Sequence, residues 1–364
     1  MKKLKILLLY SGSEIRRTFS YQTGWVKYFL RDPHFETSAF NVQAPGLIAG
    51  LRFRLSVMLS RTDAVVILHS VFSNSLCLGG RLFETIKRMS QPKAFFIGNE
   101  YKLLPEKMKF CEDLGLCLLV TMNPDERAQA LYRDRLGCRV TCIPSAGVDS
   151  ELFRPVKAWE ERKLDLGYRA VASPLYLGHD ERREIAEFFK RRAEVLSLAA
   201  DISLDPADRF TAEQWAAFLN DCRGQIGTEA GGDYFELDDR TRLRVNQYLK
   251  EHSGAGLKEI RARFFENYPD PVPVRTISGR HAEAAASGTV QILFEGRYND
   301  YFQPDVHYIP LRKDFSNADD ALRKFRDREF CRQLAQNAQD TVLRELTYEK
   351  LIERFYGELL KAGL

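Results

Sequence analysis

The sequence of 364 residues predicts an α/β protein made of two Rossmann-like domains. Three observations support this fold class. Short, nearly wholly apolar runs alternate with amphipathic helical stretches, which is typical of parallel strands covered by helices on both faces. The alternation stops at a stretch containing proline and glycine near residue 150 and then starts again. The length also suits two domains, each with its own core.

Five apolar runs are the expected strands of the first half. The first run follows a charged start, but it is too short for a signal peptide and no cleavage site follows it, so we interpret it as a buried strand. The stretch Pro124–Leu136 has the start signal and the periodicity of a helix. The expected strands are Lys5–Tyr10, Ala64–His69, Ala94–Gly98, Leu116–Thr121 and Arg139–Ile143.

A linker is expected at Pro144–Pro155, where prolines and a glycine interrupt the pattern. The first domain should then cover residues 1–155 and the second residues 156–345, while residues 346–364 form a helix that could pack back on the first domain. Two such domains predict a ligand cleft between them, at the carboxyl ends of the strands. The elements expected after the linker are strands at Leu164–Arg169, Ala200–Leu204, Gln225–Gly227, Thr289–Phe294 and Val306–Ile309, and helices at Asp180–Ser197, Thr211–Asp221, Leu237–Asn267 (two) and Ala318–Leu364.

The composition excludes several classes of protein. Charged residues make up 29% of the chain and apolar runs are regularly spaced, which argues against global disorder. No run reaches the roughly 18 apolar residues that a membrane-spanning helix needs. The seven cysteines include no CxxC pair, so we expect reduced thiols in a cytoplasm rather than disulfides or a zinc site.

The net charge of +4 is divided unevenly along the chain. Residues 1–155 contain 22 Lys and Arg against 14 Asp and Glu, whereas the remaining 209 residues contain 32 against 36. This excess predicts an anionic partner for the first half, with a merely solvated surface as the alternative. The stretch Leu47–Leu59 has helical spacing and lies beside Arg52, Arg54 and Arg61, so it forms either a basic helix on an anionic membrane or a helix packed on the sheet.

The strongest local signal for a binding site is the segment Ile277–Gly288. Ser278 is a helix cap, and the free N–H groups of the first helical turn suit a diphosphate. Arg280 and His281 lie in that turn and could add hydrogen bonds, while the carboxylate of Glu283 could accept two vicinal ribose hydroxyls. The alternative is a capped surface helix whose glutamate only favours the helix dipole.

These residues resemble a known family. The spacing Ser278-x-Arg280-x-x-Glu283 is similar to the nucleotide-sugar motif of group 1 glycosyltransferases, which have the GT-B architecture of two Rossmann-like domains facing a central cleft. The linker resembles their interdomain signature. The segments Gly227–Gly231, Ile292–Asn299 and His307–Asn317 are similar to the branch that includes the spore-maturation-type glycosyltransferases.

The resemblance implies a donor bound mainly by the second domain and an acceptor bound mainly by the first. Glu283 would hold the ribose, and Arg280 with the backbone after Ser278 would contact the diphosphate. Arg169 matches the family's phosphate-binding arginine. Many retaining members have another glutamate eight positions before the ribose glutamate, where this chain has Arg275, so the stereochemical outcome stays open. The basic residue usually found shortly after the phosphate arginine is also not evident.

Three residues are candidates for the catalytic base. Glu229 lies in Gly227-Thr228-Glu229, a glycine-rich stretch after a short strand, where it could contact the sugar or the acceptor or act as a base. A glycine-rich turn with a solvated acid is the alternative. His69 and Glu100 follow two strands of the first half, and either could deprotonate an acceptor hydroxyl. For His69 the alternative is a histidine at a strand end whose hydrogen bonds are satisfied within the protein.

The sequence therefore predicts a glycosyltransferase that moves a sugar from a nucleotide-diphosphate sugar to a glycan or lipid-linked acceptor, in the synthesis of cell-surface polysaccharide or glycoconjugate. We expect no metal, no cofactor and no nucleic-acid partner, and a cytoplasmic location that could include peripheral contact with the inner membrane face. The alternatives are a non-catalytic two-domain protein that binds a nucleotide or glycan, and a sugar-nucleotide epimerase.

Overall fold

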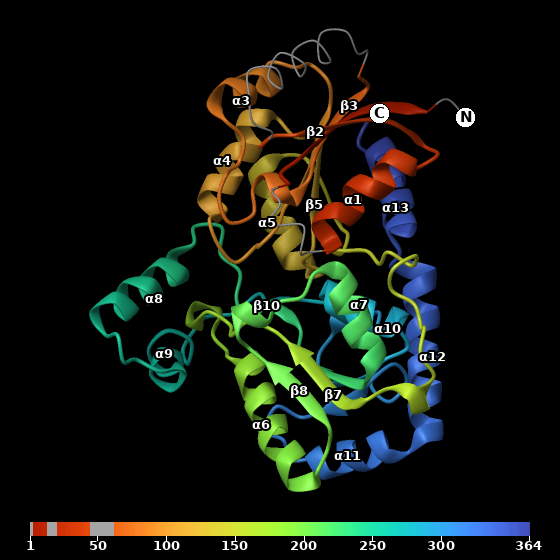
Figure 1. The fold of residues 1–364 in the computed structure, drawn as a ribbon. Coiled ribbons are helices and arrows are strands. Elements are labelled where there is room, and N and C mark those ends of the chain that lie inside the picture. Colours follow the sequence, from red (N-terminus) through yellow and green to blue (C-terminus); the bar gives the residue numbers. More distant parts are fainter. Residues whose placement is uncertain (1–2, 13–19, 44–61) are drawn as a thin grey trace. The chain divides into compact units, whose positions relative to one another are not determined.

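The computed structural model describes residues 3–12, 20–43 and 62–364 of the chain (Figure 1). These residues form two compact units. Unit 1 comprises Met1–Ala146, Phe235–Asp239 and Tyr348–Leu364, and unit 2 comprises Gly147–Tyr234 and Arg240–Thr347.

One feature expected from the sequence, the basic stretch Leu47–Leu59 with Arg52, Arg54 and Arg61, lies outside the described residues. Within the described ranges, no helix is long and apolar enough to cross a membrane.

Unit 1 is built on a sheet of six parallel strands in the order β2-β1-β3-β4-β5-β6. Its central strands are buried along their whole length, as the apolar runs predict. The strand β2 was not predicted because it lies at the sheet edge and several of its side chains are exposed. The strands are β1 (Leu4–Tyr10), β2 (Phe35–Asn41), β3 (Ala64–Ile67), β4 (Lys93–Phe96), β5 (Leu118–Thr121) and β6 (Arg139–Cys142), and the helices are α1 (Ser20–Arg31), α3 (Gly80–Lys87), α4 (Leu104–Leu114), α5 (Glu126–Leu136) and α13 (Tyr348–Lys361).

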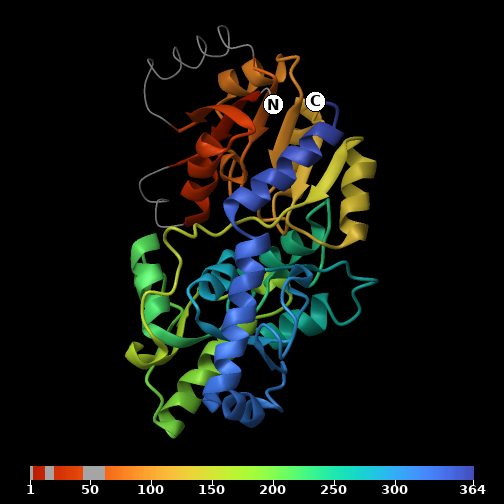
Figure 2. The same cartoon turned by 90° about the vertical axis from the view of Figure 1, so that its right-hand side faces the viewer.

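The C-terminal helix α13 belongs to the aromatic core of unit 1 (Figure 2). The ring of Phe355 is fully buried, and its centroid lies 5.8 Å from that of Phe29 and 4.9 Å from that of Phe96. Tyr348 stacks on Tyr28 at 5.2 Å. The last helix of the chain therefore completes a core whose other members come from the first hundred residues.

Replacing Phe355 by alanine should lower the free energy of unfolding of unit 1 by about 3–5 kcal/mol, because a fully buried ring leaves a cavity. Urea unfolding followed by the fluorescence of Trp25, which is 5.0 Å from Phe96, measures the loss. Leu360→Ala on the same helix is the control, because Leu360 is 40% exposed. Equal midpoints for the two variants would contradict this role of α13.

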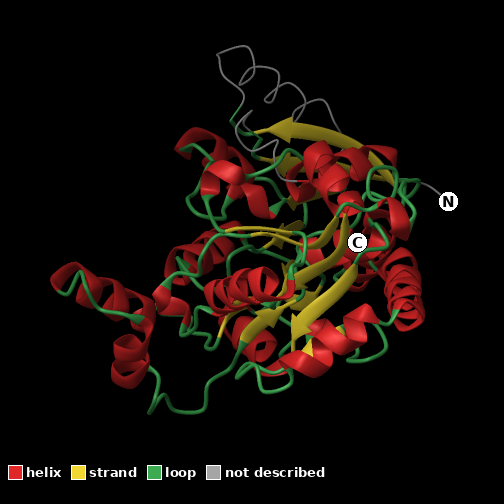
Figure 3. Cartoon of the chain, turned by 60° about the horizontal axis from the view of Figure 1, so that its bottom comes forward, coloured by secondary structure: helices red, strands yellow, loops and turns green. Residues whose placement is uncertain are grey.

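Unit 2 is built on five parallel strands in the order β13-β12-β9-β7-β8, with a separate antiparallel pair of β10 and β11. Helices lie on both sides of the strands (Figure 3). The strands are β7 (Leu164–Arg169), β8 (Ala200–Ser203), β9 (Cys222–Gly227), β10 (Ala230–Gly232), β11 (Val274–Thr276), β12 (Val290–Phe294) and β13 (Ile309–Leu311), and the helices are α6 (Glu181–Leu196), α7 (Ala212–Asp221), α8 (Arg240–Glu251), α9 (Leu257–Phe264), α10 (Gly279–Ala286), α11 (Ala318–Arg326) and α12 (Arg328–Glu345).

In both sheets the strand order reverses beside the first strand. In unit 1 this happens between β1 and β3, and in unit 2 between β7 and β9. Open α/β sheets bind ligands at the carboxyl ends of the strands at such a switch point. Two segments follow strands at these switch points and are candidates for ligand contacts. They are His69 in unit 1, which begins the short helix η2 (His69–Val71), and Thr228–Glu229 in unit 2.

Candidate functional site

The predicted binding helix is α10, and its first turn is built as the sequence indicates. Ser278 is the N-cap, and its backbone N–H donates to Nδ1 of His281 at 3.2 Å. The imidazole also bonds the backbone of Thr228, and burial together with the charges of Arg280 and Arg182 lowers the pKa of His281 to about 3. His281 is therefore a neutral side chain that joins the start of α10 to the end of β9.

Glu283 is buried, with 4% of its surface exposed, and its carboxylate is oriented by another helix. The indole Nε1 of Trp215 on α7 donates to Oε2 of Glu283 at 2.8 Å. Trp215 is itself stacked on Phe218 at a ring separation of 5.6 Å. The sequence predicted Glu283 on the helix that is α10 in the structure. It did not indicate the hydrogen bond from Trp215, which is 68 residues away in the chain.

Two arginines lie near the helix start. Arg280 is exposed at the second position of α10, and Arg182 is half-buried at the second position of α6. The charges of both act on the buried hydroxyl of Tyr168, whose pKa is raised by burial and lowered in part by them. Arg182 was not predicted, although its place at the start of a helix that follows a strand could have indicated it.

Arg169 does not have the surroundings of a free phosphate ligand. Its guanidinium forms an ion pair with Asp201 at 2.6 Å and lies over the rings of Phe210 and Phe218, 4.9 and 4.8 Å from their centroids. The resemblance assigns this arginine to the donor phosphates. The structure instead has it bound to the neighbouring strand, so a phosphate contact would first require that pair to open.

Glu229 lies just beyond β9, after a glycine that has no room for a side chain. A Cβ at Gly227 would lie 2.9 Å from Leu293 and 3.2 Å from the imidazole of His281. Glu229 is 8% exposed, and its Oε1 accepts a hydrogen bond from the backbone N–H of Tyr298 at 2.7 Å. Burial raises the pKa of Glu229, although the bond from Tyr298 and the charge of Arg275 oppose the rise.

A left-handed turn fixes this carboxylate. Tyr298, Asn299 and Asp300 have φ angles of 47°, 53° and 64°, which cost L-residues about 1–2 kcal/mol each. The turn is held because Asn299 Oδ1 accepts from the backbone N–H of Ile277 at 2.7 Å, next to the cap of α10. Strain that its surroundings maintain in this way is common at functional sites.

Arg275, which departs from the family pattern, is part of a buried ion cluster. Its guanidinium donates to both carboxylate oxygens of Glu181 at 2.8 and 2.9 Å, and to Asp233 at 3.0 Å. Lys313 contacts the same glutamate at 2.7 Å, and Thr228 donates its hydroxyl to it. Burial opposes ionisation of Glu181, but these cations and His179 lower its pKa to about 2. Arg275 therefore binds another protein side chain here.

This cluster should make the stability of unit 2 depend on pH. The pKa of Glu181 falls from 4.5 to about 2 on folding, so its stabilisation is present above pH 4.5 and is lost as the pH falls toward 2. Glu181→Gln should cost about 3 kcal/mol at pH 7, and the difference from wild type should shrink at pH 3. Urea unfolding at both values tests this, with exposed Glu187→Gln as the control. A difference that does not depend on pH would contradict it.

In unit 1, Glu100 is fully enclosed. Its carboxylate accepts from the Thr121 hydroxyl at 2.5 Å, from the Tyr132 hydroxyl at 2.8 Å and from the backbone N–H of Met122 at 2.8 Å. Burial raises its pKa. These contacts hold the ends of β4 and β5 together, so the arrangement favours a positioning role over contact with an acceptor.

His69 is the other candidate in unit 1, at the end of β3. It is 6% exposed, and burial lowers its pKa to about 4, so the imidazole is neutral at neutral pH. The neighbouring turn is fixed by a bond from the backbone N–H of Ser11 to the Ser70 hydroxyl at 3.0 Å. His69 therefore lies at the switch point of the first sheet, where a ligand is expected.

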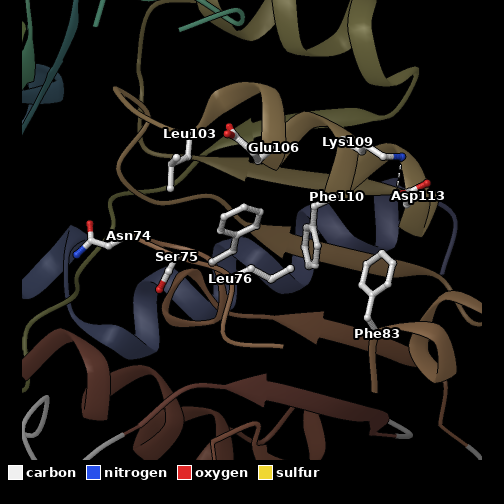
Figure 4. Close-up of a pocket in the computed structure, with 10 residues that line it drawn as sticks. Asn74, Ser75, Leu76, Phe83, Leu103, Glu106, Lys109, Phe110 and Asp113 are labelled. Carbon is white, nitrogen blue, oxygen red and sulfur yellow. Dashed lines mark hydrogen bonds and ion pairs between the residues drawn. The ribbon is translucent and has the colours of Figure 1, made fainter. Parts of the chain in front are cut away.

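A cavity of about 450 Å³ lies beside this region, between α3, α4 and the loop after β3 (Figure 4). Its walls are mainly aromatic and aliphatic, and the ion pair of Lys109 with Asp113, 2.9 Å long, lies at its edge. Nothing in the sequence pattern indicated it. The lining residues are Phe72, Asn74, Ser75, Leu76, Phe83, Leu103, Glu106, Lys109, Phe110 and Asp113.

The wall of this cavity is held by a buried lysine. Lys107 donates to the backbone carbonyls of Gly98, Asn99 and Lys102 at 2.6, 2.9 and 2.9 Å, which fixes the loop before α4. The last residue of that loop, Leu103, has a φ of 55°, an unfavourable angle for leucine. The cavity is therefore lined by a loop whose conformation is strongly constrained.

Comparisons with known proteins find a family match for part of the chain and structures with a similar fold. Residues 234–357 match a family model described as glycosyl transferase-like. A sucrose-phosphate synthase from Thermosynechococcus elongatus has a TM-score of 0.53 and 11% identity, with 99% of this chain and 100% of that chain covered. A glycosyltransferase from Rickettsia africae has a TM-score of 0.51 and 10% identity, covering 100% and 99%.

The N-terminal domain of a Candida albicans trehalose-6-phosphate phosphatase also has a TM-score of 0.51 and 10% identity, covering 100% of this chain and 98% of that chain. A search of curated protein sequences finds no match. The α/β fold class predicted from the sequence is confirmed. The chain has the GT-B fold, and its residues 234–357 match the glycosyl transferase-like family model.

Proposed function

We propose that this protein is a glycosyltransferase that transfers a sugar from a nucleotide-diphosphate donor to an acceptor hydroxyl. The observation that carries the proposal is the first turn of α10. It combines a capped helix start, the exposed cation of Arg280 and the buried carboxylate of Glu283, within the part of the chain that matches the glycosyl transferase-like family model.

The donor's nucleotide half would bind in unit 2. Glu283, held by Trp215, would accept hydrogen bonds from the two ribose hydroxyls. The free N–H groups of α10, with Arg280 and Arg182, would bind the diphosphate, because helix starts and guanidinium groups both favour anions. In this proposal, protein cations take up the charge that develops on the departing nucleotide diphosphate.

The transfer step needs a group that takes the proton of the acceptor hydroxyl. As that oxygen attacks the anomeric carbon, the bond from the sugar to the diphosphate breaks, and the nucleotide diphosphate leaves with the bonding electrons. We assign the base to Glu229, whose carboxylate lies at the switch point of the second sheet. His69 is the second candidate, because its imidazole is neutral and lies at the switch point of the first sheet.

The acceptor would bind in unit 1, and the cavity beside α4 supports one with an apolar group, such as a lipid-linked glycan. Its aromatic lining and volume suit a hydrocarbon group. A glycan linked to a prenyl chain should then have a higher kcat/KM than the same glycan without it. Leu76→Glu should remove that advantage and leave the free glycan unaffected.

The experiment that tests the proposed function is a turnover screen across nucleotide sugars, read as release of nucleotide diphosphate with acceptor and without it. A transferase releases it faster when acceptor is added, and chelation of metals should leave the rate unchanged. Tight donor binding without any release would favour a binding protein. Conversion of the donor sugar without acceptor would favour an epimerase.

We propose that the reaction takes place in the cytoplasm, in the synthesis of a glycoconjugate precursor. A nucleotide-sugar donor and seven free thiols are consistent with that compartment.

A further inference from the structure

A helical hairpin of α8 and α9 extends from unit 2 away from its parallel sheet (Figures 1 and 3). It packs against the short helix η4 (Leu175–Leu177) through its inner side, where Val245 and Ile260 are fully buried. The hairpin is therefore a folded element with one face fixed on unit 2. Its outer face serves none of the contacts assigned to donor or acceptor.

The charge of this hairpin opposes that of the rest of the second half. Residues 240–264 contain seven Lys and Arg against two glutamates, whereas residues 156–364 as a whole contain 32 against 36. The hairpin therefore has a net positive charge, although the second half of the chain as a whole has a net negative charge. Such a local excess favours an anionic partner.

The outer face of α8 is a cationic stripe with an apolar residue in it. Its members recur at helical spacing, and Leu243 is 54% exposed between positively charged neighbours. About half of the surface of Leu243 is therefore open to a partner. The stripe consists of Arg240, Leu243, Arg244, Gln247 and Lys250, and it ends at the exposed Glu251, to which the amide of Gln247 donates a hydrogen bond.

Two cations of the hairpin lie over aromatic rings and form no ion pair with a described carboxylate. Arg263 is 4.5 Å from the ring centre of Tyr248, and Arg244 is 5.5 Å from that of Phe264. Among described residues, no carboxylate lies within ion-pair distance of Arg244, Lys250 or Arg263. By contrast, the surface arginines of α12 do form ion pairs with glutamates, namely Arg328, Arg332 and Arg344 with Glu160, Glu329 and Glu345.

We propose that the outer face of this hairpin binds the surface of an anionic lipid bilayer. Its cations would contact lipid phosphates, and Leu243 would enter the headgroup layer. Two observations favour lipid over single-stranded nucleic acid. The stripe has an apolar side chain at its centre, and the faces of Tyr248 and Phe264, which bases would need for stacking, are covered by guanidinium groups.

The test is sedimentation of the full chain with vesicles of phosphatidylcholine, with and without phosphatidylglycerol. The protein should pellet only with the anionic vesicles. Binding should weaken as ionic strength rises from about 0.1 M to about 1 M, because the Debye length falls from about 10 Å to about 3 Å. Leu243→Gln should reduce binding at constant charge.

The variant R244E/K250E/R263E should lose at least tenfold in vesicle affinity. Its matched control, R328E/R332E/R344E, has the same net charge and should bind nearly as wild type does. Thermal unfolding of both variants verifies that unit 2 stays folded. Vesicle sedimentation requires neither a donor nor turnover. The lipid proposal can therefore be wrong while the proposed function is right, and the proposed function can be wrong while the lipid proposal is right.

Four results would overturn the proposal. The first is a failure of the wild-type chain to pellet with anionic vesicles, and the second is an equal loss in the α12 control. The third is tighter binding of a single-stranded RNA oligonucleotide than of anionic vesicles, with the hairpin variant losing the RNA. If R52E/R54E/R61E abolishes pelleting and the hairpin variant does not, the lipid contact belongs to the first half of the chain and the proposal is wrong.

Discussion

Replacing Glu229 by glutamine should lower kcat by about 10²–10⁴, the usual contribution of a general base, and leave donor binding nearly unchanged. The amide keeps the oxygen that accepts from the backbone N–H of Tyr298, so the turn at residues 298–300 should persist. Only the ability to take a proton is lost. Steady-state kinetics with saturating donor and acceptor measure this effect.

The pH dependence adds a second readout of the same residue. A base must be ionised, and burial raises the pKa of Glu229, so kcat should rise with pH through a value above that of an ordinary glutamate. His69→Gln is the comparison, because His69 is the competing base. If His69→Gln lowers kcat as strongly and Glu229→Gln does not, the base lies in unit 1 and the assignment to Glu229 is wrong.

Replacing the two arginines near the start of α10 should lower kcat/KM for the donor about as strongly as Glu229→Gln lowers kcat. Hydrogen bonds to charged groups contribute about 1.5–3 kcal/mol, so Arg280→Ala and Arg182→Ala should each lower kcat/KM by about 10–100-fold. The double variant should lose about 10³-fold if the two contacts are independent. Part of the loss should appear in kcat, because the leaving diphosphate gains charge in the transition state.

Arg183→Ala is the matched control for this prediction. Arg183 is the next residue on α6, its side chain is 52% exposed, and it forms an ion pair with Asp180 at 2.7 Å. It should retain wild-type kinetics. Unchanged binding of a nucleoside diphosphate to the Arg182 and Arg280 double variant would remove both arginines from the phosphate site.

The fold could be predicted where burial is nearly continuous along a strand. The strands β3, β4 and β5 are apolar runs because both of their faces are covered. The edge strand β2 has exposed side chains and gave no such run. The strand β13 begins at Ile309, where the predicted strand Val306–Ile309 ends, because His307 and its neighbours form a turn.

The candidate site could be predicted only where its signals are local. The helix cap, Arg280 and Glu283 share one turn and were found from the sequence. The bond from Trp215 to Glu283 and the pairing of Arg275 with Glu181 join residues 68 and 94 positions apart, which no local pattern reveals. The left-handed turn at residues 298–300 contains no glycine, so its conformation gave no signal either.

Arg169 shows that a motif does not reveal which side chains a residue contacts. Its position at the end of β7 matches a phosphate ligand, but the neighbouring strand supplies Asp201, and α7 supplies the ring of Phe218. Those partners depend on which strands pair. The strand order, with β8 beside β7, could not be derived from the motif.

The central claim is that Glu283 binds the ribose of a nucleotide-sugar donor, and calorimetric titration tests it most directly. Wild type should bind at least one nucleotide-diphosphate sugar, and Glu283→Ala should bind it at least tenfold more weakly, since hydrogen bonds to a charged group contribute about 1.5–3 kcal/mol. Trp215→Phe, which removes only the indole N–H that orients the carboxylate, should give a smaller loss. Equal affinity of Glu283→Ala and wild type for every nucleotide sugar tested would contradict the claim.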